Sequence, residues 1–155
     1  MLNIAIGSDH AGYPLKEKIK EYLISKGYHV LDFGTQSTDS TDYPLFARDV
    51  CLAVQRGEAQ MGILVCGTGI GMSITANKFK GIRAALCLNE YMARMSRKHN
   101  DANVLCLGDR ILGDDLAIAI VDAWLSTDFE GGRHERRVRL IREIEHSSKG
   151  LQESS

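Results

Sequence analysis

The fold is decided by Gly62-Ile63-Leu64-Val65-Cys66-Gly67-Thr68-Gly69-Ile70-Gly71-Met72-Ser73. The apolar run 63–65 predicts a short buried strand that ends at Cys66, and helix-compatible residues resume through Asn77. Three glycines at alternate positions lie between the strand and the helix. Because glycine tolerates positive φ and lets a ligand approach the main chain, we expect the N–H groups of this loop to form an anion site.

Cys66 stands at the junction of that strand and that loop. A thiol surrounded by main-chain N–H groups lies in positive potential, which favours the reactive thiolate. One loop therefore offers both a candidate base or nucleophile and a cradle for negative charge. A purely structural turn around an ordinary buried thiol is the alternative interpretation.

A nucleotide-binding loop is a second alternative, and the sequence argues against it. The dinucleotide pattern G-x-G-x-x-G would require glycine where Met72 stands, and an acidic residue closing the next strand where Asn89 stands. A Walker loop would need Gly-Lys-Ser or Gly-Lys-Thr, and no lysine follows the glycines.

The chain has 155 residues, of which 44% are apolar and 25% charged, which is ordinary for one globular domain. We expect a single domain over residues 1–146 and a frayed, flexible tail over 147–155. The net charge of −1 argues against bulk attraction to nucleic acid or to anionic membranes. No apolar run approaches the roughly 18 residues of a membrane span. The start of the chain lacks the pattern of a signal peptide, so a cytoplasmic protein is expected.

The four cysteines are widely separated and show no metal-ligand spacing. We therefore expect reduced thiols and neither a structural zinc site nor any other bound metal. Cys51, Cys87 and Cys106 lie in apolar runs without adjoining glycines, which is typical of unreactive core thiols.

Predicted strands and helices alternate along the whole chain. The predicted strands are 3–6, 29–33, 63–65, 83–88 and 104–107, and the predicted helices begin near Pro14, Pro44, Ile70, Glu90, Asp114 and Arg133. Asp114 is expected to cap its helix. The alternation predicts an α/β fold, a three-layer α/β/α Rossmann-like sandwich around a five-stranded parallel sheet.

Ligands of such sheets bind beyond the carboxyl ends of the strands. Asp9-His10, the glycine loop and Asp109-Arg110 each follow a predicted strand, so we expect them to converge. Arg133 and Arg137 are four apart on one helix, a spacing that suits two guanidinium groups binding a phosphate. His99, close to a helix end, could equally be a favourably placed cation with no catalytic role.

Several short motifs in the same order resemble the ribose-5-phosphate isomerase B family, which includes the galactose-6-phosphate isomerase subunits and uses no cofactor. The resemblance runs from about Asn3 to Ile144 and rests on Gly7-Ser8-Asp9-His10, Thr41-Asp42-Tyr43-Pro44, Cys66-Gly67-Thr68-Gly69-Ile70-Gly71, Ala76-Asn77-Lys78, Ser96-Arg97-Lys98-His99-Asn100-Asp101 and Gly131-Gly132-Arg133-His134. One branch of this family carries a glutamate base at the position of Met72, so the chain resembles the branch that uses cysteine.

The resemblance implies a role for each matched residue in the sugar chemistry. Cys66 would be the base that moves a proton between C1 and C2, and Thr68 would assist through its hydroxyl. His99 would open the furanose ring, and Asp9 would help to hold the sugar. The main-chain N–H groups that would hold the enediolate oxygen are those of Gly67, Thr68, Gly69, Ile70 and Gly71.

The resemblance also implies how the phosphate is bound and how the chains assemble. The phosphate would be bound by His10, Arg110, Arg133 and Arg137, with Tyr43 and Asn100 as further substrate contacts. Family active sites are shared between subunits, which implies a homodimer or a dimer of dimers. No metal or organic cofactor would be required.

The expected activity is the interconversion of D-ribose 5-phosphate and D-ribulose 5-phosphate in the pentose phosphate pathway. An isomerase of a six-carbon sugar phosphate, such as allose 6-phosphate or galactose 6-phosphate, is the alternative within the same chemistry. A non-catalytic nucleotide- or metabolite-binding module and a thiol redox protein are alternatives from other classes.

Overall fold

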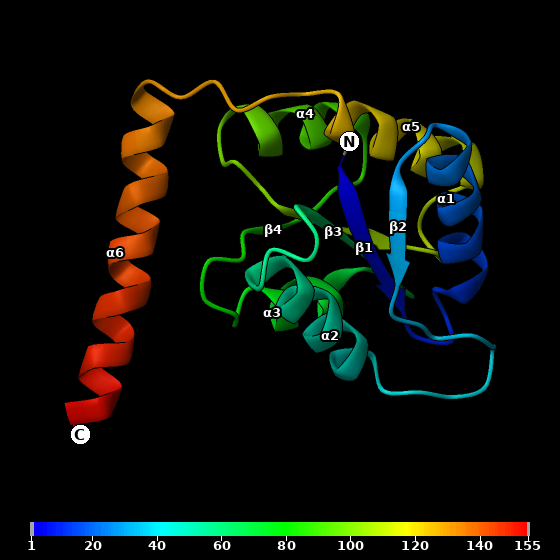
Figure 1. The fold of residues 1–155 in the computed structure, drawn as a ribbon, viewed down its shortest axis with the longest axis horizontal. Helices are drawn as coiled ribbons and strands as arrows, with labels where there is room; N and C mark the ends of the chain where they lie inside the picture. Colours follow the sequence, from blue (N-terminus) through cyan, green and yellow to red (C-terminus); the bar gives the residue numbers. More distant parts are fainter. Residues whose placement is uncertain (1, 155) are drawn as a thin grey trace.

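The computed structural model describes the backbone of residues 2–154 and the side chains of residues 2–147. Five parallel strands form one sheet in the order β2-β1-β3-β5-β4 (Figure 1). The strands are β1 (Asn3–Ser8), β2 (His29–Asp32), β3 (Met61–Cys66), β4 (Ala84–Leu86) and β5 (Val104–Gly108). The helices are α1 (Tyr13–Ser25), α2 (Tyr43–Gln55), α3 (Ile70–Ala76), α4 (Glu90–Lys98), α5 (Asp114–Leu125) and α6 (Arg133–Ser154).

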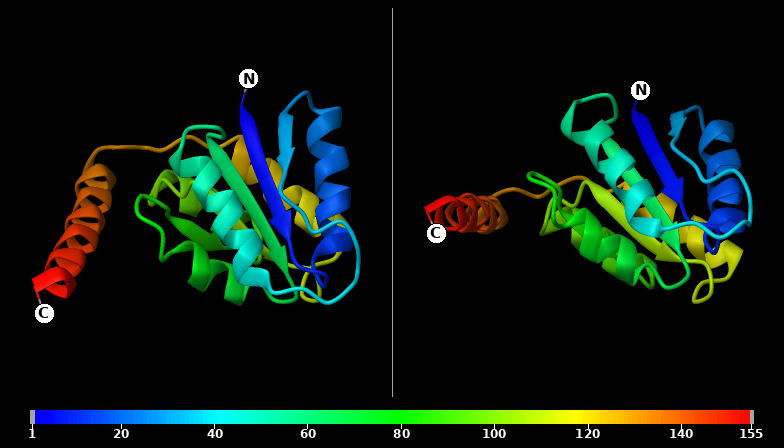
Figure 2. Two further views of the ribbon diagram at one scale, coloured as in Figure 1. Left: turned by 60° about the horizontal axis from the view of Figure 1, so that its bottom comes forward. Right: turned by 90° about the horizontal axis from the view of Figure 1, so that it is seen from below.

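Apolar side chains cover both faces of the sheet, because successive residues of a strand point to opposite sides. One core joins α1, α4 and α5 to one face, with Trp124 fully buried at its centre. The other core joins α2 and α3 to the opposite face and includes Cys66 and Met72. The predicted α/β/α sandwich around a five-stranded parallel sheet is therefore confirmed (Figure 2).

The strand order creates a switch point between β1 and β3. From β1 the chain moves outward to β2, whereas from β3 it moves the other way to the edge strand β4 and then returns to β5. The helices that follow β1 and β3 consequently lie on opposite faces and leave a crevice beyond the carboxyl ends of these two strands, the usual ligand position in open α/β sheets. The register pairs Ser8 with Val65, so Asp9 and Cys66 begin this crevice side by side.

Two local predictions differ from the structure. The fourth strand covers only Ala84–Leu86 of the predicted run 83–88, because its parallel pairing with β5 spans three residues. Gly113, not Asp114, is the N-cap residue of α5, and Asp114 is the first helical residue. Helix α6 extends to Ser154 and residue 155 lies outside the described residues, so the flexibility of the tail 147–155 stays a prediction.

Helix α6 stands beside the sheet rather than over it (Figures 1 and 2). Its carboxylate Glu145 accepts a hydrogen bond from the N–H of Gly81 at 3.1 Å. Leu140, Ile141 and Ile144 remain about half exposed or more, at 49%, 49% and 65%. An apolar helix face with this exposure lacks a complete packing partner within the described part of the chain. No helix among the described residues has the length and apolar character needed to cross a membrane.

The close approach of α1 to β3 generates a prediction on stability. A Cβ at Gly12 would overlap the main-chain carbonyl of Val65, one residue before Cys66. Gly12→Ala is expected to lower the free energy of unfolding by about 1–3 kcal/mol, measured by urea denaturation. Gly113→Ser is the control, because nothing lies within 4 Å of a Cβ there and serine suits an N-cap. Equal stability of the two variants would contradict the packing argument.

Candidate active site

A cavity of about 430 Å³ lies at the carboxyl ends of β1 and β3. Its lining brings together three segments that the sequence had predicted to converge. The lining residues are Asp9, His10, Ala11, Tyr43, Cys66, Gly67, Thr68, Ile70, Gly71, Ile74 and Arg110. Ala11 and Ile74 were not anticipated, although Ile74 lies one helical turn after Ile70, a spacing that would place both on one face of α3.

The loop after β3 folds back onto the sulfur of Cys66. Gly69 adopts φ 81°, and its N–H donates a hydrogen bond to the Cys66 Sγ at 3.1 Å. A Cβ at Gly69 would lie 2.6 Å from the Leu86 side chain, so only glycine fits this turn. An N–H donor at this distance stabilises negative charge on sulfur. The loop thus positions a thiol at the cavity with a donor already directed at it.

The other three cysteines have a different environment. Burial raises the pKa of Cys51 to about 12 and that of Cys87 to about 11, and it raises the pKa of Cys106 well above its usual range. None of the three lines the cavity beside Cys66. The prediction that they are unreactive core thiols is supported by this burial.

The segment after β5 is tied to the cysteine loop by main-chain hydrogen bonds. The N–H of Asp109 donates to the Cys66 carbonyl at 2.9 Å, and that of Arg110 donates to the Gly67 carbonyl at 3.0 Å. The Asp109 carboxylate is occupied elsewhere, accepting from the N–H of Leu15 at 3.0 Å. The Arg110 guanidinium lies against Gly67, where a Cβ would be 3.2 Å from its Nη1. This arrangement presents one cation to the cavity.

Asp9, after β1, and Thr68, within the cysteine loop, both line the cavity and differ in burial. Asp9 is buried, and one of its carboxylate oxygens accepts from the N–H of Gly12 at 2.9 Å. The second oxygen remains available to a hydroxyl group in the cavity. Thr68 is exposed, and its hydroxyl accepts from the N–H of Ile70 at 3.2 Å, which leaves its own proton free to be donated.

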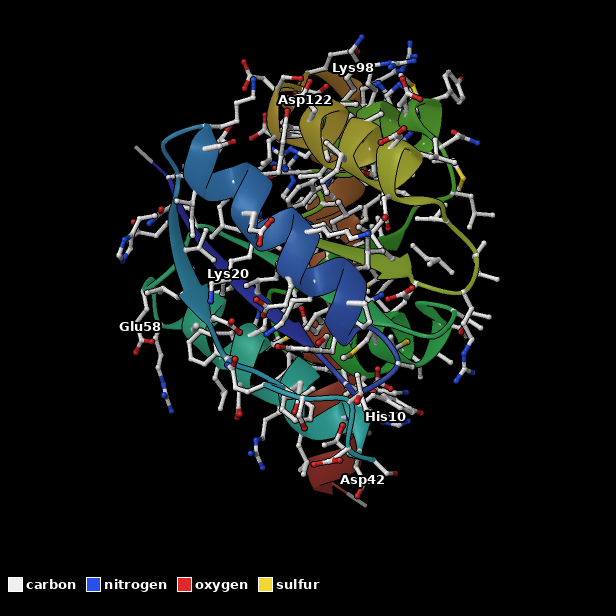
Figure 3. All side chains as sticks on the ribbon, turned by 90° about the vertical axis from the view of Figure 1, so that its right-hand side faces the viewer. His10, Lys20, Asp42, Glu58, Lys98 and Asp122 are labelled. Atoms are coloured by element: carbon white, nitrogen blue, oxygen red, sulfur yellow. The ribbon has the colours of Figure 1, made fainter. Side chains whose placement is uncertain are left out.

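Four predicted site residues, His99, Asn100, Arg133 and Arg137, do not line this cavity. His99 and Asn100 follow α4 and precede β5, so they lie at the amino edge of the sheet, whereas Cys66 lies at the carboxyl edge. The length of β5 from Val104 to Gly108, at about 3.3 Å per residue, separates these two edges by about 13 Å. Figure 3 labels His10 and Lys98, and they lie at opposite ends of the molecule. Within one chain the expected residues therefore form two separate groups.

The second group is centred on two stacked imidazoles. The rings of His99 and His134 are 4.2 Å apart with an interplanar angle of 14°. Burial, together with His99 and Arg133, lowers the pKa of His134. The His134 Nε2 lies 3.7 Å from a Glu130 carboxylate oxygen. The N–H of Glu130 in turn donates to the Lys98 carbonyl at 3.1 Å, which ties this segment to the end of α4.

His99, Glu130 and His134 offer ligand atoms within 4.8 Å of one another, so we considered them as a metal site. The lone pair of an imidazole nitrogen lies in the plane of its ring. Because the two rings are nearly parallel and face to face, their lone pairs run side by side rather than converge on one point. This geometry suits stacking and does not assemble the tetrahedral ligand set that zinc prefers.

The sequence model of the ribose/galactose isomerase family matches residues 4–141. The chain belongs to this family. Ribose-5-phosphate isomerase B of Escherichia coli (strain K12) is 54% identical, over 94% of this chain and 97% of its own length. Ribose-5-phosphate isomerase B of Clostridium thermocellum is 57% identical in sequence to this chain. Its structure superposes with a TM-score of 0.94, over 95% of this chain and 99% of that one.

A third similar protein adds a ligand. The Mycoplasma genitalium ribose-5-phosphate isomerase B was solved with bound ribulose-5-phosphate, and it is 46% identical to this chain. Its TM-score is 0.89, over 93% of this chain and 96% of that one. Because the two chains match over nearly their whole lengths, the shared feature is the entire fold.

The contrast among the cysteines generates a prediction on thiol reactivity. At about pH 8 a thiol of pKa about 11, as in Cys87, is ionised in only about one molecule in a thousand, since the pH lies below its pKa. We expect iodoacetamide to alkylate Cys66 first in the folded protein, read by peptide mass spectrometry. Cys66→Ser should remove the fast phase. Alkylation of Cys51 or Cys87 at a similar rate would contradict the assignment.

Proposed function

We propose that the protein is an aldose–ketose isomerase that interconverts D-ribose 5-phosphate and D-ribulose 5-phosphate, as in the pentose phosphate pathway, through a cis-enediolate. The observation that carries this proposal is the Cys66 sulfur at the cavity, hydrogen-bonded by the Gly69 N–H. Membership of the ribose/galactose isomerase family supports it, as does the ribulose-5-phosphate bound to a similar protein.

Cys66 is the base of the proposed reaction. Its thiolate removes the proton from C2 of the open-chain aldose, and the electron pair of that C–H bond forms the C1–C2 double bond of the enediolate. The thiol then returns the proton to C1, which yields the ketose without net change in atoms or electrons. The Thr68 hydroxyl moves the second proton between the two substrate oxygens. Main-chain N–H groups of the loop 67–71 stabilise the oxygen that becomes negative, while that of Gly69 donates to the sulfur and that of Ile70 to the Thr68 hydroxyl.

Charged groups at the two ends of the substrate position its carbons over the sulfur. His10 and Arg110 contribute to phosphate binding, because both line the cavity and offer it an imidazole and a guanidinium group. Asp9 holds a sugar hydroxyl through its unoccupied carboxylate oxygen. Fixing the phosphate lowers the orientational part of the barrier for proton transfer. The mechanism uses side chains and amides only and requires no metal or organic cofactor.

The remaining residues reach the cavity from a second copy of the chain. His99 opens the sugar ring, while Asn100, Arg133 and Arg137 contact the substrate from the partner. Two observations support this assembly. The second group lies at the wrong edge of the sheet to act on the chain's own Cys66. In addition, α6, which carries both arginines, leaves Ile141 and Ile144 exposed beside an apolar hollow of about 510 Å³, a surface suited to burial in a homodimer.

Cys66→Ala tests the base directly. We expect kcat for ribose 5-phosphate to fall by about 10³-fold, in the range typical for loss of a general base, with KM little changed. Circular dichroism and unfolding curves establish that the variant folds. Cys51→Ala, which removes a buried thiol outside the cavity, should retain kcat. If Cys66→Ala keeps more than about a tenth of kcat, the assigned base is wrong.

An isomerase of a six-carbon sugar phosphate remains the second candidate, because the family itself joins ribose and galactose isomerases. The length of the substrate between C1 and the phosphate distinguishes the two. A coupled assay with five- and six-carbon aldose phosphates, with a chelator present, measures kcat/KM for each. Higher kcat/KM on the six-carbon substrates would replace the five-carbon assignment and leave the role of Cys66 intact.

The shared site generates a prediction for mixed subunits. Cys66→Ala and His99→Asn homodimers each lack one group at both sites, whereas their heterodimer has one complete site of two. Unfolding and refolding the inactive variants together in equal amounts should restore about a quarter of wild-type activity, since half of the random dimers are mixed. The same two variants refolded separately and then mixed are the control. No recovery in the refolded mixture would show that both residues act within one chain.

A further inference from the structure

Thr41, the first residue of the motif Thr41-Asp42-Tyr43-Pro44, holds the imidazole of His10, a residue far from it in the sequence. Thr41 contacts His10, 31 residues earlier, through two hydrogen bonds from main-chain N–H groups, and its hydroxyl oxygen also lies 3.5 Å from the ring nitrogen Nδ1. The His10 N–H donates to the Thr41 hydroxyl at 3.1 Å. In return, the Thr41 N–H donates to the His10 ring nitrogen Nδ1 at 3.1 Å. These reciprocal bonds fix both the backbone and the ring of His10 at the edge of the cavity.

The second of these bonds determines where the ring carries its proton. A main-chain N–H can only donate, so Nδ1 must be the acceptor and has no hydrogen of its own. In a neutral imidazole the proton then resides on Nε2. No hydrogen bond between described residues reaches Nε2, and His10 lines the cavity. The ring is therefore prepared to donate one hydrogen bond, from Nε2, to a ligand oxygen.

Thr41 is itself held in place through the start of its loop. The N–H of Ser8 donates to the Gly34 carbonyl at 2.6 Å, and the N–H of Thr35 donates to the Ser8 carbonyl at 2.7 Å. The fully buried Lys16 donates to the Thr35 carbonyl at 2.6 Å. These contacts attach the loop between β2 and α2 to the carboxyl edge of β1, next to the residue that carries the imidazole. The start of the loop that carries Thr41 is consequently attached to the sheet, and Thr41 itself is held by its contacts with His10.

We propose that the main-chain N–H of Thr41 is a positioning group that holds His10 as the Nε2–H tautomer, so that His10 binds the substrate's phosphate as a hydrogen-bond donor through Nε2. The phosphate contact rests on the proposed function, whereas the tautomer follows from the Thr41 contact alone. Thr41 does not touch the substrate in this arrangement and acts only through the imidazole.

The tautomer is measurable without any turnover. Histidine ring nitrogens with and without hydrogen differ in ¹⁵N chemical shift. The chain has five histidines, and the pair of ring signals that is lost in His10→Gln belongs to His10. At a pH about two units above the ordinary histidine value, the wild-type spectrum should show hydrogen on Nε2 of His10. A wild-type signal with hydrogen on Nδ1 would overturn the proposal.

Two substitutions at Thr41 separate the N–H from the hydroxyl. Thr41→Pro removes the N–H, so the Nδ1–H tautomer should become populated. Thr41→Ala keeps the N–H and removes only the hydroxyl, so the Nε2–H tautomer should persist. We expect KM for ribose 5-phosphate and Ki for inorganic phosphate to rise about tenfold in the proline variant and clearly less in the alanine variant, with kcat changed less than KM. Equal tautomers in the two variants would overturn the role of the N–H.

Substitutions at His10 keep the proposal testable if Thr41→Pro does not fold. The amide nitrogen of glutamine reaches the position of Nε2, whereas asparagine reaches only that of Nδ1. His10→Gln should therefore retain phosphate binding within about threefold, and His10→Asn should weaken it about tenfold, measured with inorganic phosphate. The reverse order would overturn donation through Nε2. If the wild type shows the Nε2–H tautomer and binds phosphate but does not isomerise sugars, the proposed function fails and this inference stands.

Discussion

The hydrogen bond from the Gly69 N–H to the Cys66 sulfur is the contact on which the site depends. It forms because the chain turns back at φ 81° directly after the strand, in a space where any Cβ would collide with Leu86. Residues of the same turn line the cavity, so in the proposed enzyme the donor to sulfur and the donors for a developing oxyanion come from one stretch of backbone. Burial alone favours a neutral thiol, as the raised pKa values of Cys51 and Cys87 show. The amide contact is what distinguishes Cys66 from them.

A parallel sheet imposes a second constraint, since all its strands end at one edge. Residues that follow strands meet at the carboxyl edge, and residues that follow helices return to the amino edge. Cys66 belongs to the first class and His99 to the second, so no adjustment of loops within this fold brings them together. In the proposed enzyme the two edges meet only between copies of the chain. Half of the chemistry of the proposed enzyme then depends on association, and the exposed apolar side chains of α6 are the surface that we propose for it.

The sequence predicted most of the fold, because strands such as 63–65 are continuous apolar runs and helices such as Glu90–Lys98 begin and end at recognisable residues. It also predicted the convergence of Asp9, Cys66 and Arg110, which follows from the strand-end rule alone. The failures have local causes. Gly113 is the N-cap of α5 with no side-chain hydrogen bond to mark it, and a helix boundary read from sequence is uncertain by a residue or two. The separation of His99 and Arg133 from the cavity is not a failure of this kind, because the resemblance implied a site shared between subunits without saying which residues each subunit supplies.

The loop between β2 and α2 shows why the contact between Thr41 and His10 could not be predicted from the sequence. Its polar composition predicts a surface loop, yet its start is anchored by Lys16, which is fully buried and bonded to both Asp32 carboxylate oxygens at 2.9 and 3.0 Å. Burial by itself raises the pKa of Asp32, but the hydrogen bonds from Lys16 and from the Gly34 N–H reverse this and lower it. From the sequence alone, a lysine on α1 such as Lys16 is expected to be exposed to solvent, because its partner Asp32 on the next strand is not yet known. Here the buried pair holds the start of the loop at Gly34 and Thr35, and the same loop later brings Thr41 to the imidazole of His10.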